Sequence, residues 1–458
     1  MAGIGFELRK IYRKRTLGAV IWGSVYASLS SIGLTVLFSA LMVILNFLLV
    51  KFGTPLTIRQ TFTASFTWLC LISVVISCTL GTVLSRYISD CIFRNENAEI
   101  SAALFGSILL SGAMSGVIFL AIAILMYWKM QASIVWCLLC YLAGTGVCVS
   151  YTIMTFITTI KEYRLVSGSY VVAGICTLTL ITVMHLLGYK GIAGLYGGIM
   201  LGFWVMNVLL IALSVRSFGT PSTNYFAFLR WYKKYPVLAM GSLLYILGFY
   251  LPSIIYWLFS PMKMQIGIFC VTPGYDLALF LSVLSGMPAL VLFIVRTETS
   301  FSEQCRQYLS AIGSASYDRI EEERKRLVLQ TDADLFSVYE VQLLLCIFII
   351  CLINVFFPYF GMTTEVLNQF SMLALGNYCI TCMYFTIILF YYFEDYRSAI
   401  VGPAVLFGTV LIGSLLCSFV IQDWYSLPWL IGGFFSWGIS FLLLRKRMNT
   451  LNEFLMCQ

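Results

Sequence analysis

This sequence contains little charge and almost no histidine. Only 10% of its 458 residues are charged, whereas an ordinary soluble domain has about 25%. His185 is the single histidine, so a catalytic zinc ion held by paired histidines is excluded. No Lys follows a Gly, which also excludes the phosphate-binding loop G-x-x-x-x-G-K-[ST]. We therefore expect no enzyme activity, no ATP hydrolysis, no cofactor and no metal.

The sequence is instead rich in long apolar runs. Hydrophobic residues make up 60% of the chain and form unbroken runs of about 20 residues or more, which is the length of a helix that crosses a bilayer. A transmembrane barrel would instead show short segments of alternating polarity. The sequence thus predicts an all-α polytopic membrane protein. The twelve predicted spans are 18–50, 60–88, 100–127, 132–160, 165–187, 191–215, 236–260, 275–295, 336–358, 366–391, 397–421 and 427–444.

The basic residues are distributed unevenly around these spans. If the N-terminus lies inside, 23 of the 28 Lys and Arg residues fall on the inner side and 5 on the outer side. This bias follows the positive-inside rule and predicts that both termini are cytoplasmic, in the cell membrane of a bacterium. Anionic lipid at the inner face then accounts for the net charge of +8, and no nucleic-acid partner is needed.

A polar stretch at 216–235 separates six spans from six spans. Because six is even, the two halves would have the same orientation, which is a known plan of transporters. We expect a lobe at 18–215, a cytoplasmic linker at 216–235 and a second lobe at 236–458. Residues 1–17 read as a short interfacial helix or as a simple topological anchor.

Two features distinguish the second half. Pro252, Pro288 and Pro403 fall inside predicted spans, which favours bent and more deformable helices there. An inner loop at 297–335 carries 13 of the 48 charged residues, and its segment 318–326 predicts an exposed helix. This loop is either a solvated linker or a docking surface for a cytoplasmic partner.

Ionisable groups inside a membrane are functional candidates, because burying charge in lipid is expensive. We expect Asp276 and Glu340 to face a cavity, whereas most others lie close enough to an interface to reach water. Buried Asn residues bind either substrate or neighbouring helices. The substrate-path candidates are Asp276, Glu340, His185, Asn207, Asn354 and Asn377. The cytoplasmic-face candidates are Arg86, Arg296, Glu298, Glu394 and Asp395.

Four stretches carry a resemblance to a known family. They are the opening Met1–Lys10, the segment Ser85–Asp90, the glycine-rich Gly194–Gly198, and Pro288–Phe301, which contains Arg-Thr-Glu-Thr-x-Phe. In these stretches, and along its whole length, the chain resembles the PelG family, the polytopic component of Pel exopolysaccharide export. That family belongs to the polysaccharide branch of the multidrug/oligosaccharidyl-lipid/polysaccharide (MOP) flippase superfamily, which includes the MATE transporters.

The resemblance implies a function and partners. It implies two lobes of six helices, a cargo polymer rich in N-acetylgalactosamine, and membership of a complex. The implied partners are a PelF-like cytoplasmic glycosyltransferase and a PelD-like cyclic-di-GMP receptor in the membrane. Three functions stay open at this point: a polysaccharide exporter, an ion-coupled flippase for lipid-linked oligosaccharides or drugs, and a non-conducting scaffold for a glycosyltransferase.

Overall fold

The computed structural model describes residues 41–158, 163–189, 191–360 and 363–456, and these form two compact units. The N-unit comprises the described residues up to Ile246 together with Lys263–Val271. The C-unit comprises Leu247–Met262 and the described residues from Thr272 onward. Helix α9 (Pro236–Phe259) is therefore shared, because its first half packs in the N-unit and its second half in the C-unit.

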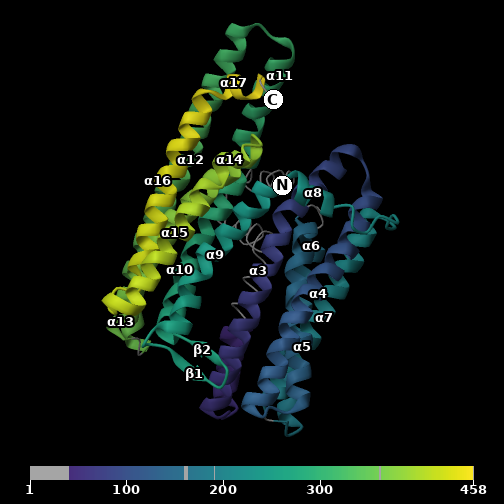
Figure 1. Cartoon of the computed structure of the whole chain (residues 1–458), viewed down its shortest axis with the longest axis vertical. Coiled ribbons are helices and arrows are strands. Elements are labelled where there is room, and N and C mark those ends of the chain that lie inside the picture. Colours follow the sequence, from purple (N-terminus) through teal and green to yellow (C-terminus); the bar gives the residue numbers. More distant parts are fainter. Residues whose placement is uncertain (1–40, 159–162, 190, 361–362, 457–458) are drawn as a thin grey trace, which may run out of the picture. The chain divides into compact units, whose positions relative to one another are not determined.

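The N-unit is a bundle of long helices in which α5 packs against α3, α4 and α7, and α6 packs on α7 (Figure 1). A short apolar helix, Leu41–Lys51, precedes them. A hairpin of two antiparallel strands also belongs to this unit and contacts α3. The elements are α3 (Leu56–Arg94), α4 (Asn97–Met130), α5 (Ile134–Ile157), α6 (Tyr163–Leu186), α7 (Ile192–Phe218), α8 (Leu229–Lys234), β1 (Met264–Ile266) and β2 (Phe269–Val271).

Local sequence explains how these helices end and how closely they pack. Asn95 and Gln131 adopt the left-handed conformation that terminates α3 and α4, and the Ser133 hydroxyl accepts a hydrogen bond from the Trp136 N–H at the start of α5. A Cβ on Gly202 of α7 would lie 1.8 Å from Thr177 Oγ1 of α6. Only glycine permits this approach, as is usual where membrane helices pack closely.

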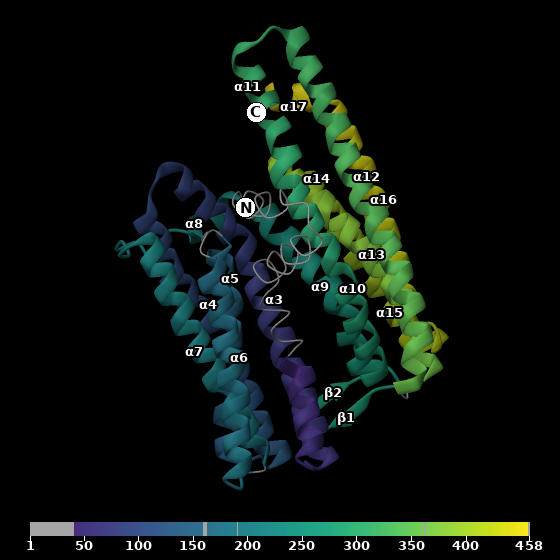
Figure 2. The same cartoon turned by 180° about the vertical axis from the view of Figure 1, so that it is seen from behind.

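The C-unit is built around α13, which packs against α10, α12 and α16, while α15 packs on α16. Figure 2 shows from behind how α11 turns back into α12. The elements are α10 (Pro273–Arg296), the π-helical η1 (Thr297–Phe301), α11 (Ser302–Ser314), α12 (Tyr317–Phe356), η2 (Phe357–Phe360), α13 (Thr364–Tyr392), α14 (Tyr396–Ala399), α15 (Val401–Leu416), η3 (Cys417–Ile421), α16 (Leu427–Asn449) and α17 (Leu451–Met456).

Eleven helices among the described residues are long and apolar enough to cross a membrane. Each coincides with one of the predicted spans from 60–88 onward, which confirms the all-helical polytopic class. Of the first predicted span, only the short helix Leu41–Lys51 falls within the described residues, and residues 1–17 lie outside them.

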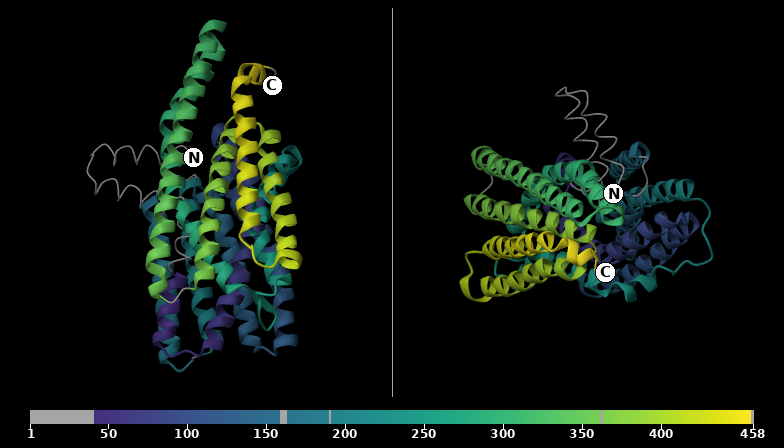
Figure 3. Two further views of the ribbon diagram at one scale, coloured as in Figure 1. Left: turned by 90° about the vertical axis from the view of Figure 1, so that its left-hand side faces the viewer. Right: turned by 90° about the horizontal axis from the view of Figure 1, so that it is seen from above.

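Two features of the second half add to what the sequence predicts. The segment 297–335 is helical for most of its length, and the charged helix predicted at 318–326 continues without a break into span nine as α12. At 1.5 Å per residue its 40 residues measure about 60 Å, twice the hydrocarbon core. In side view the green α11–α12 pair extends past the yellow α16 of the same unit (Figure 3). Pro403 lies in the first turn of α15, where proline is tolerated, whereas Pro252 and Pro288 lie inside their helices.

Candidate functional site

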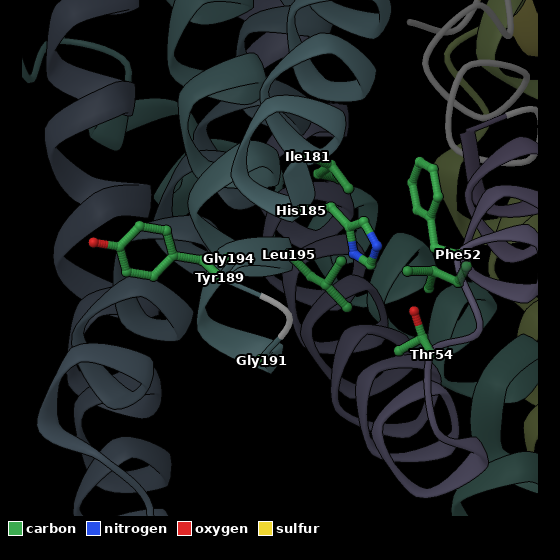
Figure 4. A pocket seen from close by; sticks show the side chains of 9 residues that line it. Phe52, Thr54, Ile181, His185, Tyr189, Gly191, Gly194 and Leu195 are labelled. Carbon is green, nitrogen blue, oxygen red and sulfur yellow. The ribbon is translucent and has the colours of Figure 1, made fainter. Parts of the chain in front are cut away.

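A small cavity, with room for about one water molecule, lies at one end of the N-unit (Figure 4). The His185 ring from the last turn of α6 stacks on Phe52, with the ring centroids 4.3 Å apart and an interplanar angle of 14°. Thr54 is only 8% exposed, and its Oγ1 makes no hydrogen bond within the described part of the chain. In Figure 4 this hydroxyl points toward the two rings. The cavity is thus lined by an aromatic pair and an unpaired hydroxyl, and its size suits a single bound water or one polar substituent of a larger molecule.

Asp276 is held in the first turn of α10. Its carboxylate accepts hydrogen bonds from Trp257 Nε1 at 3.1 and 2.9 Å and from the backbone N–H of Thr272 at 2.9 Å. Trp257 is buried on α9. These donors orient the carboxylate inside the C-unit and supply part of the hydrogen bonding that a buried carboxylate needs. The expectation that Asp276 faces a cavity stays a prediction.

Asn207 joins two helices of the N-unit. The side chain is 1% exposed on α7, its Nδ2 donates to the carbonyl of Gly146 at 2.9 Å, and its Oδ1 accepts from Ser150 Oγ at 2.7 Å. Both partners lie on α5. This geometry matches the interhelical role of buried amides in membranes.

Two amides of the C-unit bind the turn that precedes Pro288 in α10. Asn377 of α13 donates from Nδ2 to the carbonyl of Ser282 at 2.9 Å. Gln342 of α12 donates from Nε2 to the carbonyl of Ser285 at 3.0 Å. Pro288 has no N–H, so the carbonyl that loses its helical donor is that of Leu284, and the two amides bind carbonyls on either side of it. Gln342 was not predicted as a functional residue, because its relation to Pro288 is only visible in three dimensions.

The remaining substrate-path candidates lie on exposed positions of α12. Asn354 donates from Nδ2 to the carbonyl of Ile350 at 2.9 Å and to Ser371 Oγ of α13 at 3.1 Å. Glu340 is exposed on the surface of the C-unit. Within the units, His185, Asp276, Asn207, Asn354 and Asn377 therefore occupy separate places rather than one cluster.

Arg86 belongs to a cluster at the end of α3 in the N-unit. Its Nε lies 3.2 Å from Asp90 Oδ1, and its guanidinium lies 5.7 Å from the centroid of the Tyr235 ring. Asp90 also accepts a hydrogen bond from Trp231 Nε1 at 2.8 Å. The hydrogen bond between Trp231 and Asp90 thereby fixes the predicted linker, 216–235, against α3. The sequence did not identify these two residues as the contact that holds the segment.

Arg296 and the π-helical segment η1 contact α12. Arg296 NH1 lies 3.4 Å from Asp334 Oδ1, and Ser300 Oγ donates to Asp334 Oδ2 at 2.7 Å. Asp334 is buried and thus ties the end of α10 to α12. Glu298 lies in η1, and its side chain is outside the described part of the structure.

Glu394 and Asp395 form the connection between α13 and α14. Glu394 has a φ of 59°, in the left-handed region. Asp395 is buried, accepts a hydrogen bond from the N–H of Ser398 as the N-cap of α14, and pairs with Arg447 of α16. A buried aspartate with both contacts is part of the framework of the C-unit.

A polar network joins α11, α12 and α17. Arg324 donates to Glu321 and to the carbonyls of Met448 and Asn449 at the end of α16. Asn452 donates to Glu321 and accepts from the Tyr308 hydroxyl at 2.7 Å. Burial raises the pKa of Tyr308 to about 12, so the phenol stays neutral and can donate. The segment 297–335 is therefore bound to the C-terminal helices rather than freely solvated.

Comparisons with known proteins agree with this architecture. A family model described as "PelG: Putative exopolysaccharide Exporter (EPS-E)" matches residues 1–455. No curated protein matches the chain at a significant level.

Several solved membrane transporters have a similar structure. An outward-facing multidrug resistance MATE family transporter of the MOP superfamily has a TM-score of 0.65 at 13% identity, over 94% of this chain and 95% of that chain. A MOP superfamily transporter from Pyrococcus furiosus has a TM-score of 0.63 at 13% identity, over 94% and 95%. The Vibrio cholerae MATE transporter VcmN in its bent form has a TM-score of 0.61 at 13% identity, over 98% and 99%. At such low identity these likenesses establish the fold alone.

Proposed function

Since the chain belongs to the PelG family of exopolysaccharide exporters and has the fold of the MOP superfamily transporters, we propose that it moves a growing Pel-like polysaccharide outward across a bacterial cell membrane. The observation that carries this proposal is the family match, which runs over residues 1–455 and thus includes every described helix up to Leu455. The positive-inside pattern of the sequence adds the orientation, with both termini in the cytoplasm.

The scarcity of ionisable residues inside the predicted spans supports a neutral, hydroxyl-rich cargo. The cavity of the N-unit combines the stacked rings of His185 and Phe52 with the hydroxyl of Thr54. Aromatic faces pack against the apolar faces of sugar rings, while hydroxyl and amide groups orient the sugar substituents. Because this cavity has room for only about one water molecule, it can contact a single substituent of such a cargo and cannot enclose a sugar ring.

A complex with the polymerising enzyme would supply the driving force. We propose a cytoplasmic glycosyltransferase of the PelF kind, which would push the polymer as it grows, and a membrane-bound cyclic-di-GMP receptor of the PelD kind. The long inner extension formed by α11 and the first half of α12 is the proposed contact surface for such a partner. Its exposed side chains include Glu322 and Arg326.

Deletion of the gene tests the proposal most directly. The glycosyltransferase is left intact, and polymer is quantified outside and inside the cells. We expect extracellular polymer to disappear and to return when the full chain is supplied in trans. Undiminished secretion from the deletion strain would contradict the proposal, whereas polymer that accumulates inside would support a defect of transport rather than of synthesis.

Ion-coupled flipping of a lipid-linked oligosaccharide or a drug is the second candidate, and the half-buried, hydrogen-bonded carboxylate of Asp276 is the observation that favours it. Asp276→Asn keeps an oxygen that can accept from Trp257 and removes the charge. If transport depends on that charge, Asp276→Asn abolishes it, and collapse of the proton or sodium gradient does the same. Export that survives both treatments supports the polymer exporter.

A non-conducting scaffold is the third candidate, favoured by the size of the inner extension. Reversal of the exposed pair, Glu322→Arg with Arg326→Glu, changes the surface of α12 but leaves the Arg324 network in place. A scaffold would lose both polymerase recruitment and polymer synthesis with this variant. It would also tolerate substitution of Thr54 and His185 in the N-unit cavity, which an exporter that uses this cavity would not.

A further inference from the structure

Helix α8 and its neighbours form a surface of cations and aromatic rings on the N-unit. The helix spans Leu229–Lys234 and reads Leu-Arg-Trp-Tyr-Lys-Lys. We define the α8 surface as Arg86, Arg230, Trp231, Lys233, Lys234 and Tyr235. Arg230, Lys233 and Lys234 are exposed.

The α8 surface is fixed to the body of the N-unit. Trp231 Nε1 donates to Asp90 Oδ2 at 2.8 Å, and the Tyr232 hydroxyl donates to the carbonyl of Leu80 at 2.6 Å. The Trp231 ring also packs edge-on against Tyr87, with the centroids 4.9 Å apart. Because these contacts hold the helix, a ligand would not have to order it on binding.

Positive charge accumulates around one ring of this surface. Lys234 Nζ lies 5.1 Å from the centroid of Tyr235 and 5.9 Å from that of Trp231, and the Arg86 guanidinium approaches Tyr235 at 5.7 Å. Asp90 pairs with Arg86 at 3.2 Å, and the nearby Glu99 accepts from the Tyr87 hydroxyl at 3.3 Å. The exposed cations of α8 outnumber the carboxylates, so an anion bound there would relieve their mutual repulsion.

Apolar side chains adjoin these cations and remain uncovered. Phe226, in the segment that leads into α8, is 45% exposed, and Leu229, the first residue of α8, is 40% exposed. Phe93, in the last turn of α3, is 89% exposed. Cations above an apolar edge, with Trp and Tyr between them, are typical of segments that lie at the boundary of headgroups and acyl chains.

We propose that the α8 surface is a binding site for the phosphate headgroup of an anionic phospholipid. The phosphate contacts Arg230, Lys233 and Lys234. The rings of Trp231 and Tyr235 lie at the level of the headgroup. The acyl chains contact Phe226 and Leu229. The ligand is a lipid rather than a free phosphate, because the apolar edge adjoins the cations directly. Bound lipid would hold the end of α3 and the connection to α9 at a fixed depth in the membrane.

The test uses the full-length protein in neutral detergent. It is titrated with micelles that contain phosphatidylglycerol or phosphatidylcholine, and bound lipid is counted by native mass spectrometry. The wild type should retain phosphatidylglycerol preferentially. Each cation that contacts the bound headgroup contributes about a fivefold gain in affinity for anionic lipid, so Arg230→Gln/Lys233→Gln/Lys234→Gln should weaken binding by roughly 100-fold.

A matched control removes three exposed cations from the C-unit, Arg306→Gln/Arg319→Gln/Lys325→Gln, and should leave phosphatidylglycerol binding within about twofold of wild type. Lys233→Gln alone, which leaves the anchors of α8 in place, should weaken binding about fivefold and provides a variant that folds as the wild type does. The proposal is overturned if the first triple variant binds like wild type, if the control loses as much, or if inorganic phosphate competes as well as the lipid does.

Discussion

Gly286 and Asn377 contact each other where α10 meets α13, and this contact yields a quantitative prediction. A Cβ added at Gly286 would lie 2.7 Å from Asn377 Nδ2 and 3.2 Å from Thr381 Oγ1. Gly286→Ala must therefore displace the Asn377 amide from the carbonyl of Ser282, to which it donates at 2.9 Å. Asn377 is 4% exposed, so the displaced amide has no water to bind.

The expected change in stability combines two costs and one gain. Loss of an interhelical hydrogen bond in a membrane protein costs about 0.6 kcal/mol on average, and overpacking of a tight contact costs about 1–3 kcal/mol. Gly→Ala in an unobstructed helix gains about 0.5–1 kcal/mol. Gly286→Ala should thus destabilise the protein by about 2 kcal/mol, roughly a 30-fold shift of the folding equilibrium.

A double-mutant cycle isolates the contact. In the background of Asn377→Ala the close atom is gone, so Gly286→Ala should cost less than about 0.5 kcal/mol, with a coupling energy of about 1.5 kcal/mol. The stability of each variant is measured by unfolding in mixed micelles of increasing dodecyl sulfate content, followed by circular dichroism. Gly438→Ala is the control, because no atom lies within 4 Å of its added Cβ.

Additive costs would refute the reasoning, since independent sites add within about 0.3–0.5 kcal/mol. Export measured alongside separates two roles of Asn377. A helix-binding role predicts that extracellular polymer falls only as far as the amount of folded protein does. Complete loss of export from a normally folded Asn377→Ala protein would instead place Asn377 on the substrate path.

Three further predictions concern other contacts. Arg324→Gln should release the end of α16 and speed cleavage by trypsin there, because Arg324 donates to the carbonyl of Met448. Lys325→Gln should not, because the exposed Lys325 ammonium lies 3.9 Å from its nearest carboxylate. Equal cleavage of both variants would count against the network. Gly202→Ala should destabilise the N-unit by about 2 kcal/mol, and Thr177→Ala should restore part of that loss, as unfolding in mixed micelles would reveal. Burial raises the pKa of the Cys305 thiol to about 11, two units above its ordinary value. At pH 7 the thiolate of Cys305 should therefore be about 100-fold scarcer than that of a free thiol, and its labelling by maleimide should accelerate as the pH rises. A labelling rate that does not change with pH would disprove this.

Hydrophobicity and charge in the sequence determined the class of the protein. Uninterrupted apolar segments have one stable solution in lipid, because every backbone group must be bonded within its own helix. The eleven spans from 60–88 onward could therefore be located without a structure. The charged helix at 318–326 was also predictable, and the absence of proline and glycine between it and span nine is consistent with the continuous helix α12. The point at which this helix leaves the membrane was not predictable, because packing sets it.

The roles of individual polar residues depended on tertiary structure. Sequence could mark Asn207, Asn377 and Arg86 as unusual, since polar groups are expensive in a membrane. It could not say that Asn377 binds the turn before Pro288 with Gln342, or that Trp231 and Arg86 share Asp90. A side chain's partner is chosen by the register and rotation of two packed helices, and residues far apart along the chain leave no local signal of it.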